Sequence, residues 1–597
     1  MIYSANQVAT VLDLMDLPDD LPNGRQYVDQ GKRKGARITL GSTPFCQMHG
    51  VRSEAQYKLE CADAGRTTWS TIMGLSTVEE QVAGLQFLER FGRETTMAFD
   101  RGLVISNWLS GIPPALREGA PAGTSFILDG IDDHVRIAHA STIQPCFNDW
   151  HIGSPYCLEN TAAAVTAGGS YHGVLAQLVW DLPRYRDDVA HVVENLSAIG
   201  LVAAKRDDWL VVDSYMDDGM PSRFLDNVSL VGWALLERYV VEDLCGARYA
   251  TGFGGLMSNL ETKTAVWLAL YEVLKAEHPC LSYLYGNTIS PAREHIVQNF
   301  GLVAGEMGVF AAVERRYRTG VSLLPTPITE GLAVPTREAI ADVRLVAGRA
   351  AERACEFERL ISWPTIEATR DLLVERGREF AKNALALLEA CGVDVLDPLQ
   401  VLIALRRIGA RRLESLCHPG DGGCLEEGEV APFVPTELAL MAEELAQEEL
   451  ARVHDRGCGP AVKGRRFLVA SGDTHWCGAY AAARVLRNLG AEAIEAGVEL
   501  DPEEVVSLAE THDWPVIAVS THNGQCLDYG RRLAASLRQH GCECLTYMGG
   551  KLNAIPRGAS VPMDCTAELT ELGLIPCTTV ADLVEHQAGQ GDHDCHR

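Results

Sequence analysis

The sequence predicts an α/β protein with two domains: an N-terminal parallel (β/α)8 barrel of the TIM type and a C-terminal Rossmann-like (flavodoxin-like) sheet. Two observations lead to this fold class. After residue 464, short apolar runs alternate with amphipathic helices through short connections, as in a parallel sheet with helices on both faces. Before residue 415, longer apolar runs lie between helical patterns, which favours a parallel barrel.

The C-terminal alternation is regular. The predicted strands are RFLVAS, AEAIEAG, WPVIAVST and CECLTYMGG, and the predicted helices are AYAAARVLRNLG, PEEVVSLAETH, QCLDYGRRLAASLRQHG and ADLVEHQ. Ligands of such sheets bind outside the carboxyl ends of the strands. The loops that follow the strands are therefore where we expect a binding site.

The N-terminal part is less regular. Its candidate strands are ARITLGS, WSTIMGL, ETTMAF, WLVVDSY, ARYATGFGG, LSYLYGNT and VSLLPTP, with helical patterns such as LVGWALLERYVVEDL between them. The stretch PGDGGCLEEG then predicts a loop, and PTELALMAEELAQEELARV predicts an amphipathic helix. We expect a barrel domain at 1–415, a linker with one helix at 416–463, a second domain at 464–588 and a tail at 589–597.

Composition limits the classes of partner. The chain has 597 residues, with 52 Lys and Arg against 80 Asp and Glu, a formal charge of −28. This charge argues against broad contact with nucleic acid or anionic membranes, so we expect a small-molecule substrate, no nucleic acid and no membrane. The 18 cysteines show no framework spacing, and the N-terminus has no basic or apolar signal region. We therefore expect a cytoplasmic protein with reduced thiols.

Three loops at strand ends have unusual sequences: GDTHWCG, STHNGQ and MGGK. His475 could reach a metal through one ring nitrogen while Asp473 accepts the N–H of the other, which fixes the tautomer. Glycines would let a large ligand approach the backbone, and they are Gly478, Gly524, Gly549 and Gly550. The plainer alternative is an ordinary strand-to-helix turn with a surface histidine.

The pattern Asp-x-His-x-x-Gly, then a serine at a strand end, then Gly-Gly after the next strand, resembles the cobalamin-binding module over Arg465 to Glu585. The resemblance implies that His475 is the cobalt ligand and Asp473 its partner. It also implies that a slot for the displaced benzimidazole tail is lined by Ser520, Gly524, Gly549 and Gly550. His522 departs from the family pattern, which has an aliphatic residue there.

The stretches TPITEGLAVPTREA and MPSRFLDNVSLVGWALLERYVVEDLCGARYATGFGGLMSN look like the large subunit of glutamate mutase, also called methylaspartate mutase. STIMG and AGG fit the same family in order, and the similarity spans roughly 36–400. The resemblance implies an adenosylcobalamin-dependent radical rearrangement of a carbon skeleton, with barrel and cobalamin domain fused in one chain and a homodimer formed through the barrel. It assigns Glu330 to adenosine contact, whereas the plainer reading is an acid at a helix start.

The family's substrate site is not reproduced. WHIGSP stands where one substrate arginine is expected, no arginine follows STIMGLST, the catalytic carboxylate aligns near Val174, and Pro325 replaces a lysine. A site without these arginines is poorly suited to a dianion, so we expect an amino acid or related acid other than glutamate. The replacement residues are Trp150, His151, Tyr171, His172, Trp180 and Arg184, which could equally be barrel core. His151 or His172 is our candidate for the missing carboxylate's role.

Two other functions stay open. A corrinoid methyltransferase usually needs a four-helix cap and a zinc or folate module, but the sequence offers one helix at 435–453 and no Cys/His zinc spacing. A non-catalytic cobalamin-binding or regulatory protein derived from a mutase would fit the loss of the substrate arginines.

Overall fold

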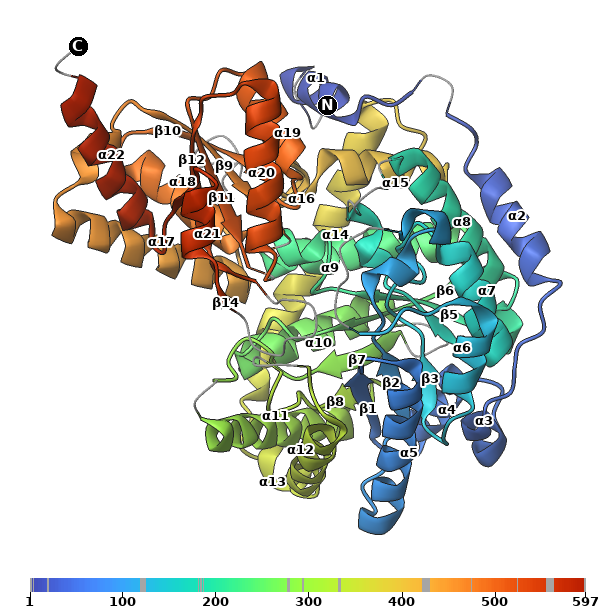
Figure 1. The fold of residues 1–597 in the computed structure, drawn as a ribbon. Helices are drawn as coiled ribbons and strands as arrows, with labels where there is room; N and C mark the ends of the chain where they lie inside the picture. Colours follow the sequence, from blue (N-terminus) through green and yellow to red (C-terminus); the bar gives the residue numbers. More distant parts are fainter. Residues whose placement is uncertain are drawn as a thin grey trace. The chain divides into compact units, whose positions relative to one another are not determined.

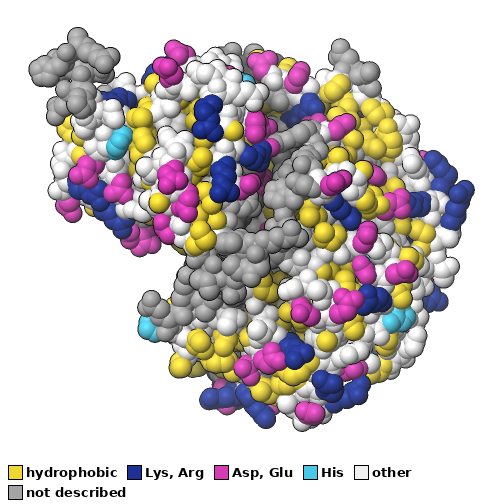
Figure 2. All heavy atoms as spheres, in the orientation of Figure 1, with side chains coloured by type: hydrophobic (Ala, Val, Ile, Leu, Met, Phe, Trp, Pro, Cys, Tyr) yellow, Lys and Arg dark blue, Asp and Glu magenta, His cyan; other side chains and the backbone are white. Residues whose placement is uncertain are grey.

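The computed structural model describes residues 3, 5–18, 21–118, 125–180, 182, 185, 187–275, 280–292, 295–330, 334–420, 430–473, 475–522, 524–554 and 563–594. The chain forms two compact units, Met1–Thr436 and Glu437–Arg597. On the face shown in Figure 2, the Lys and Arg side chains are scattered among Asp and Glu side chains.

Unit 1 is built on eight parallel strands that neighbour one another in chain order (Figure 1). They are β1 (Thr68–Met73), β2 (Arg101–Val104), β3 (Gln144–Cys146), β4 (Tyr171–His172), β5 (Val211–Tyr215), β6 (Arg248–Phe253), β7 (Leu281–Tyr285) and β8 (Ser322–Leu324). β1 pairs with β8, and a single parallel bridge between Phe147 and His172 joins the two ends of the sheet. This is the topology expected of a (β/α)8 barrel.

At least one helix follows each strand. The helices after β1 to β8 are α5 (Val78–Thr95), α6 (Gly130–Ala138), α7 (Cys157–Ala167), α8 (Asp188–Ala203), α9 (Asn227–Arg238), α10 (Leu260–Leu274), α11 (Ile296–Tyr317) and α12 (Arg337–Ala351). Within the described residues of unit 1, four helices precede β1: α1 (Ala5–Met15), α2 (Arg25–Gly35), α3 (Pro44–His49) and α4 (Glu54–Asp63). In the same described part of unit 1, four more follow α12: α13 (Ala354–Phe357), α14 (Trp363–Ala390), α15 (Pro398–Ile408) and α16 (Ala410–Cys417).

By length and composition, α11 could cross a membrane, since it has 22 residues and an 18-residue window of mean hydropathy 1.5. Half of that window is buried inside the fold, where α11 connects β7 to β8 and packs against α12. Its apolar character is therefore what a core helix of the barrel layer requires.

The barrel interior contains a buried ionic layer. Arg101 at the start of β2 is 1% exposed, and its guanidinium lies 3.0 Å from Glu54 Oε1 and 3.6 Å from Asp213 Oδ2. The same guanidinium lies over the ring of Tyr171, 4.8 Å from the centroid. Lys58 donates to the carbonyl oxygens of Leu281 and Ser282 on β7. Charges this deep are retained only when they are paired and hydrogen-bonded, so this layer fixes strands β2, β5 and β7 against each other.

Five predicted strands of the barrel are confirmed, namely β1 and β5 to β8. Two predictions were wrong: ARITLGS is irregular chain before α3, and ETTMAF is the end of α5 followed by a loop. Strands β2, β3 and β4 were missed. They have four, three and two residues, and Arg101, Gln144 and His172 interrupt the apolar pattern by which buried strands are recognised.

Unit 2 is a five-stranded parallel sheet in the order β10-β9-β11-β12-β15. Its strands are β9 (Arg466–Ser471), β10 (Glu492–Gly497), β11 (Val516–Thr521), β12 (Leu545–Gly550) and β15 (Ile575–Pro576), and a small antiparallel pair is formed by β13 (Asn553–Ala554) and β14 (Met563–Asp564). The helices are α17 (Glu437–Arg456), α18 (Cys477–Asn488), α19 (Pro502–Thr511), α20 (Cys526–His540), α21 (Thr566–Glu571) and α22 (Val580–Asp594). Every strand and helix predicted for this part is present, and the strand order is that of flavodoxin-like folds.

Two apolar layers cover the sheet of unit 2. One face packs against α17, α18 and α22 through residues such as Val469, Ala518 and Tyr547. The other packs against α19, α20 and α21 through residues such as Leu468 and Ile517. The amphipathic helix expected in the linker is α17, and it belongs to unit 2. Most of the predicted loop PGDGGCLEEG, 419–428, falls in 421–429, which lie outside the described residues.

Candidate functional site

His475 lies in the loop between β9 and α18 with its ring held at one end. Asp473 Oδ1 is 2.9 Å from His475 Nδ1 and 2.9 Å from the backbone nitrogen of the same residue. The imidazole is 51% exposed, whereas the carboxylate is 6% exposed. The described residues offer Nε2 no hydrogen-bond partner. Asp473 therefore selects the tautomer with the proton on Nδ1 and leaves Nε2 as a free, outward-facing ligand atom.

Asp473 also connects the loops after β9 and β11, because its Oδ2 accepts the backbone N–H of His522. Burial raises the pKa of the Asp473 carboxyl, but the hydrogen bonds from His475 and His522 outweigh burial, so the pKa is lowered. The carboxylate therefore stays ionised at neutral pH. β9 and β11 are neighbours, and chain order reverses between them, so this loop pair stands at the switch point where flavodoxin-like sheets bind ligands.

His522 stands beside His475, with ring centroids 5.3 Å apart and planes inclined by 31°. Its Nδ1 is buried without a hydrogen-bond partner in the part of the chain that the structure describes. Burial lowers the pKa of His522. The Asp473 charge raises it by less, and the His475 and Lys551 charges lower it further. A neutral, unpartnered imidazole at this position points to contact with a bound molecule.

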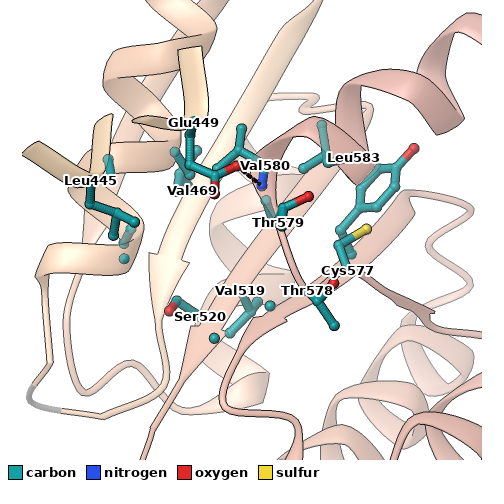
Figure 3. Close-up of a pocket in the computed structure, with 18 of the residues that line it drawn as sticks. Leu445, Glu449, Val469, Val519, Ser520, Cys577, Thr578, Thr579, Val580 and Leu583 are labelled. Carbon is teal, nitrogen blue, oxygen red and sulfur yellow. Dashed lines mark hydrogen bonds between the residues drawn. The ribbon is translucent and has the colours of Figure 1, made fainter. Parts of the chain in front are cut away.

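Next to this histidine pair, a cavity of about 140 Å³ lies between the sheet and the layer of α17, α18 and α22 (Figure 3). Its walls include Val469, Ala479, Ala518 and Tyr547 and are mostly apolar. An apolar slot of this kind suits a flat aromatic group better than a sugar or a phosphate.

Four of the predicted site residues line this cavity: Gly478, Ser520, Gly549 and Gly550. The hydroxyl of Ser520 is buried and has no hydrogen-bond partner among the described residues, so it is available to a ligand. A Cβ on Gly478 would lie 2.7 Å from that hydroxyl. A Cβ on Gly549 would meet nothing closer than 3.5 Å, so the surrounding protein does not demand glycine there. The cavity stays open because Gly478 and Gly549 carry no side chain.

The other predicted residues lie outside the cavity lining. Asp473 and His475 do not line the cavity themselves. Both contact His522, which is one of the lining residues, so they lie at the edge of the cavity. Gly524 follows in the same loop with φ +68°, a conformation that favours glycine, so its role is in the turn.

Sequence reasoning missed the contribution of α17. Leu445 and Glu449 form part of the cavity wall, and the carboxylate of Glu449 accepts the backbone N–H of Val580, 2.8 Å away, and that of Ala581 (Figure 3). Arg452 pairs with the same carboxylate. Glu449 thus stabilises the N-terminus of α22 from a neighbouring helix. The linker helix was recognised by its amphipathic pattern, but the surface that it covers could not be read from that pattern.

No known family model matches the chain. One curated relative is the fused isobutyryl-CoA mutase of Cupriavidus metallidurans (strain ATCC 43123 / DSM 2839 / NBRC 102507 / CH34), 33% identical over 99 residues. The match covers 15% of this chain and 9% of the relative. It relates part of this chain to a mutase at a distant level, and the chain spans only a small part of that protein's length.

In the barrel, Glu330 follows β8 and meets β7. Tyr285 donates its hydroxyl to Glu330 Oε1 at 3.1 Å, and Oε2 is buried without a described partner. Burial raises the pKa of Glu330, and the hydrogen bond from Tyr285 lowers it less. The helix-start alternative does not fit, because α12 begins at Arg337 and its N-cap is Thr336. Glu330 is therefore a carboxylate at the carboxyl end of the barrel.

His151 and His172 do not reach the barrel interior. Side chains alternate along a strand, and Tyr171 takes the inward position on β4, so His172 points to the opposite side, near His134 of α6. His151 Nε2 lies 2.9 Å from His134 Nε2, and its Nδ1 lies 2.9 Å from the carbonyl oxygen of Asp149. Burial lowers the pKa of both candidates, of His172 to about 3. The geometry gives no support to the roles that we expected for them.

The replacement residues are divided in the same way. Tyr171 lies in the interior, with its ring beneath the Arg101 guanidinium. Trp150 and Trp180 pack against each other with ring centroids 5.8 Å apart, in a small apolar cluster that includes Leu109 and Leu182. Arg184 lies outside the described residues. Sequence reasoning missed Asp149 in the loop after β3, where burial raises the pKa of its carboxyl to about 7 against the opposing hydrogen bond from Gln177. Its position directly after a strand was the signal that could have found it.

Proposed function

We propose that this protein is an adenosylcobalamin-dependent carbon-skeleton mutase that acts on an amino acid or related acid other than glutamate. The observation that carries the proposal is the pair Asp473–His475 at the switch point of unit 2, with an apolar slot beside it. The mutase named by the comparison, and the resemblance of the barrel to the glutamate mutase family, support the reaction class.

The residues of unit 2 fit the proposed cofactor. His475 Nε2 would ligate cobalt, and Asp473 would hold the ring and increase the basicity of Nε2. The slot lined by Gly478, Gly549 and Gly550 would take the benzimidazole tail, with the Ser520 hydroxyl as its polar contact. When bound, adenosylcobalamin supplies an adenosyl radical by homolysis of its cobalt–carbon bond.

The barrel would bind the substrate and exclude water. Its carboxyl end carries Glu330, which we assign to adenosine contact, since Oε1 is oriented by Tyr285 and Oε2 is free of described partners. The Arg101 guanidinium is paired with Glu54 and Asp213 inside the barrel. Because its charge is already compensated there, we treat it as structural and not as a replacement for the missing substrate arginines.

The test is electron paramagnetic resonance of the full chain reconstituted with cobalamin and reduced to cobalt(II), with histidine labelled by nitrogen-15. We expect the superhyperfine triplet from nitrogen-14 to become a doublet in the labelled protein and to disappear in His475→Ala. His512→Ala, at an exposed histidine at the end of α19, is the matched control and should keep the doublet. A spectrum that does not respond to the label would refute His475 as the ligand.

The second candidate is a non-catalytic cobalamin-binding protein derived from a mutase. It is favoured by the positions of His151 and His172, which leave the barrel without the residues expected to replace the family's substrate site. Reconstituted protein that shows the histidine signal but no cobalt–carbon bond cleavage with any amino acid tested would support this candidate over the mutase.

A further inference from the structure

Two cysteines, Cys542 and Cys544, lie in the short connection between α20 and β12 (Figure 1). Their sulfur atoms are 2.7 Å apart. That is closer than two unbonded sulfur atoms normally stand, and a disulfide bond needs about 2.05 Å. The two thiols are therefore in direct contact, and a small movement of the connection would bring them within bonding distance.

The fold holds each of the two cysteines from a different side. Cys542 follows Gly541, which ends α20 with φ +66°, and its backbone N–H donates to the carbonyl oxygen of Leu537 at 3.0 Å. The Cys544 thiol donates to the carbonyl oxygen of Trp514 at 3.1 Å, just before β11. Because α20 and the start of β11 supply these contacts, the meeting of the two sulfur atoms is a property of the folded domain.

Reagents in solution have access to both thiols. Most of the described cysteines are buried, whereas Cys542 and Cys544 are half-buried and Cys355 on α13 is exposed. Cys355 lies far in sequence from any other cysteine. An oxidant therefore meets two adjacent thiols in the connection before β12, and Cys355 offers a comparison with one thiol.

Metal binding is the alternative use of two neighbouring thiols. Structural zinc sites take four ligands, and the described part of the chain contains no group of three or more His, Cys, Asp and Glu side chains placed to hold an ion. His540, two residues before the pair, places its Nδ1 3.0 Å from Glu510 Oε2. Two sulfur atoms alone are too few ligands for such a site, which favours sulfur chemistry.

Cys544 keeps its proton at neutral pH. Burial is the main cause that raises the pKa of Cys544 to about 12, and the hydrogen bond with Cys542 and the nearby charges of Glu510 and Asp513 act in the same direction. A thiolate, and not a thiol, attacks a disulfide. We therefore assign the first attack to Cys542 and the second to Cys544.

We propose that Cys542 and Cys544 form a reversible redox site that exchanges with low-molecular-weight disulfides of the glutathione type. The Cys542 thiolate attacks one sulfur of the external disulfide, breaks its S–S bond and releases one thiol. Cys544 then gives its proton to solvent and attacks the Cys542 sulfur, which releases the second thiol. Two cysteine thiols are thus oxidised to one disulfide bond, and the external disulfide is reduced to two thiols.

This site goes beyond the proposed mutase function and does not rest on it. The pair directly precedes β12, whereas Gly549 and Gly550 of the cavity wall end the same six-residue strand. Since a strand rises about 3.3 Å per residue, the two sites lie at opposite ends of β12. Either site can therefore be present without the other.

The test incubates the reduced full chain with glutathione disulfide, traps the remaining thiols with N-ethylmaleimide and cleaves the chain with trypsin. Cleavage after Arg538 and Lys551 places both cysteines in one peptide, 539–551, with no other cysteine. We expect mass spectrometry to show this peptide without two hydrogens and without any adduct, and to show both thiols again after dithiothreitol. Cys355, in the peptide 354–359, should carry one glutathione. A peptide 539–551 that keeps two trapped thiols, or that retains glutathione, would overturn the proposal.

Cys544→Ser removes the second thiol and should stop the reaction at the mixed disulfide between Cys542 and glutathione. Cys355→Ser is the matched control and should still form the disulfide. Repeating the equilibrium in urea separates the fold from the local sequence. At a fixed glutathione ratio, the closed disulfide should exceed the mixed disulfide by about tenfold more in the folded chain than in the unfolded chain, because the fold holds the sulfur atoms together. Equal ratios would show that the fold builds no site here.

Discussion

The Asp473 carboxylate lies 2.9 Å from Nδ1 of His475 and equally close to the backbone nitrogen of that residue. One oxygen therefore orients both the ring and the loop, while the other oxygen holds the backbone of His522. A surface histidine in an ordinary turn has no need of a nearly buried carboxylate that connects two loops. This relationship is the reason for preferring the ligand interpretation.

The first prediction concerns that carboxylate. Asp473→Asn should weaken cobalamin binding by about 10- to 100-fold, because it removes the charge that orients and polarises His475. Titration of the full chain with hydroxocobalamin, followed by its visible absorption, measures the change. Asp528→Asn on the exposed side of α20 is the control and should bind like the unmodified protein. Unchanged affinity in Asp473→Asn would contradict the assigned role.

The second prediction concerns the cavity of unit 2, which a larger side chain at Gly549 should fill. Gly549→Leu should abolish cobalamin binding while the fold is kept, because the first carbon of the new side chain meets nothing closer than 3.5 Å and the rest occupies the cavity. Gly589→Leu places the same side chain on α22, where a Cβ meets no atom within 4 Å. Circular dichroism should be alike for both variants, and only the second should bind the cofactor. Binding by Gly549→Leu would mean that the tail lies elsewhere.

The third prediction concerns Asp149 and pH. Its folded pKa is raised to about 7, so the folded protein holds a proton that the unfolded chain releases near its ordinary pKa of about 4. The contribution of Asp149 to the unfolding free energy therefore falls as pH rises from about 4 to 7 and is then constant. Asp149→Asn should be more stable by about 1 kcal/mol at pH 5 and by up to about 4 kcal/mol at pH 8. Urea unfolding at both pH values checks this, and a difference independent of pH would contradict it.

The fourth prediction concerns the ionic layer. Arg101→Met should destabilise the barrel by about 3–5 kcal/mol, because it leaves the buried carboxylates of Glu54 and Asp213 without their cation. Arg353→Met removes an exposed pair with Glu356, which solvent screens, and should lower the stability far less. Urea unfolding of the two variants gives the comparison. Equal losses would show that the layer is not a structural requirement.

The sequence was a good guide to unit 2 because its central strands β9 and β11 are buried apolar runs that end in polar turns, and both faces of the sheet are covered by amphipathic helices. It was a poorer guide to the barrel, where short strands begin with buried polar residues such as Arg101 and Gln144. Arg101 pairs with Glu54 of α4 and Asp213 of β5, and Gln144 accepts from Thr43 and donates to the Gly168 carbonyl. These partners are distant in sequence, so a local pattern does not reveal why the two residues are buried.

The same reason explains the candidate sites. The spacing Asp473-x-His475 is local, and a two-residue separation is enough to predict the contact. His151 and Asp149 are also only two residues apart, but the direction of each side chain depends on the positive φ of Trp150 and on contacts with α6 and α8. These long-range contacts decide where each of the two side chains lies.

The place of α17 in unit 2 has a practical consequence for dissecting the chain. A fragment that starts at 464, where apolar periodicity marks the first strand, would lack Leu445 and Glu449. It would lose one wall of the slot and the carboxylate that stabilises the start of α22. A fragment that keeps the whole slot is therefore defined by packing and not by the first strand, and it has to include α17, which begins at Glu437.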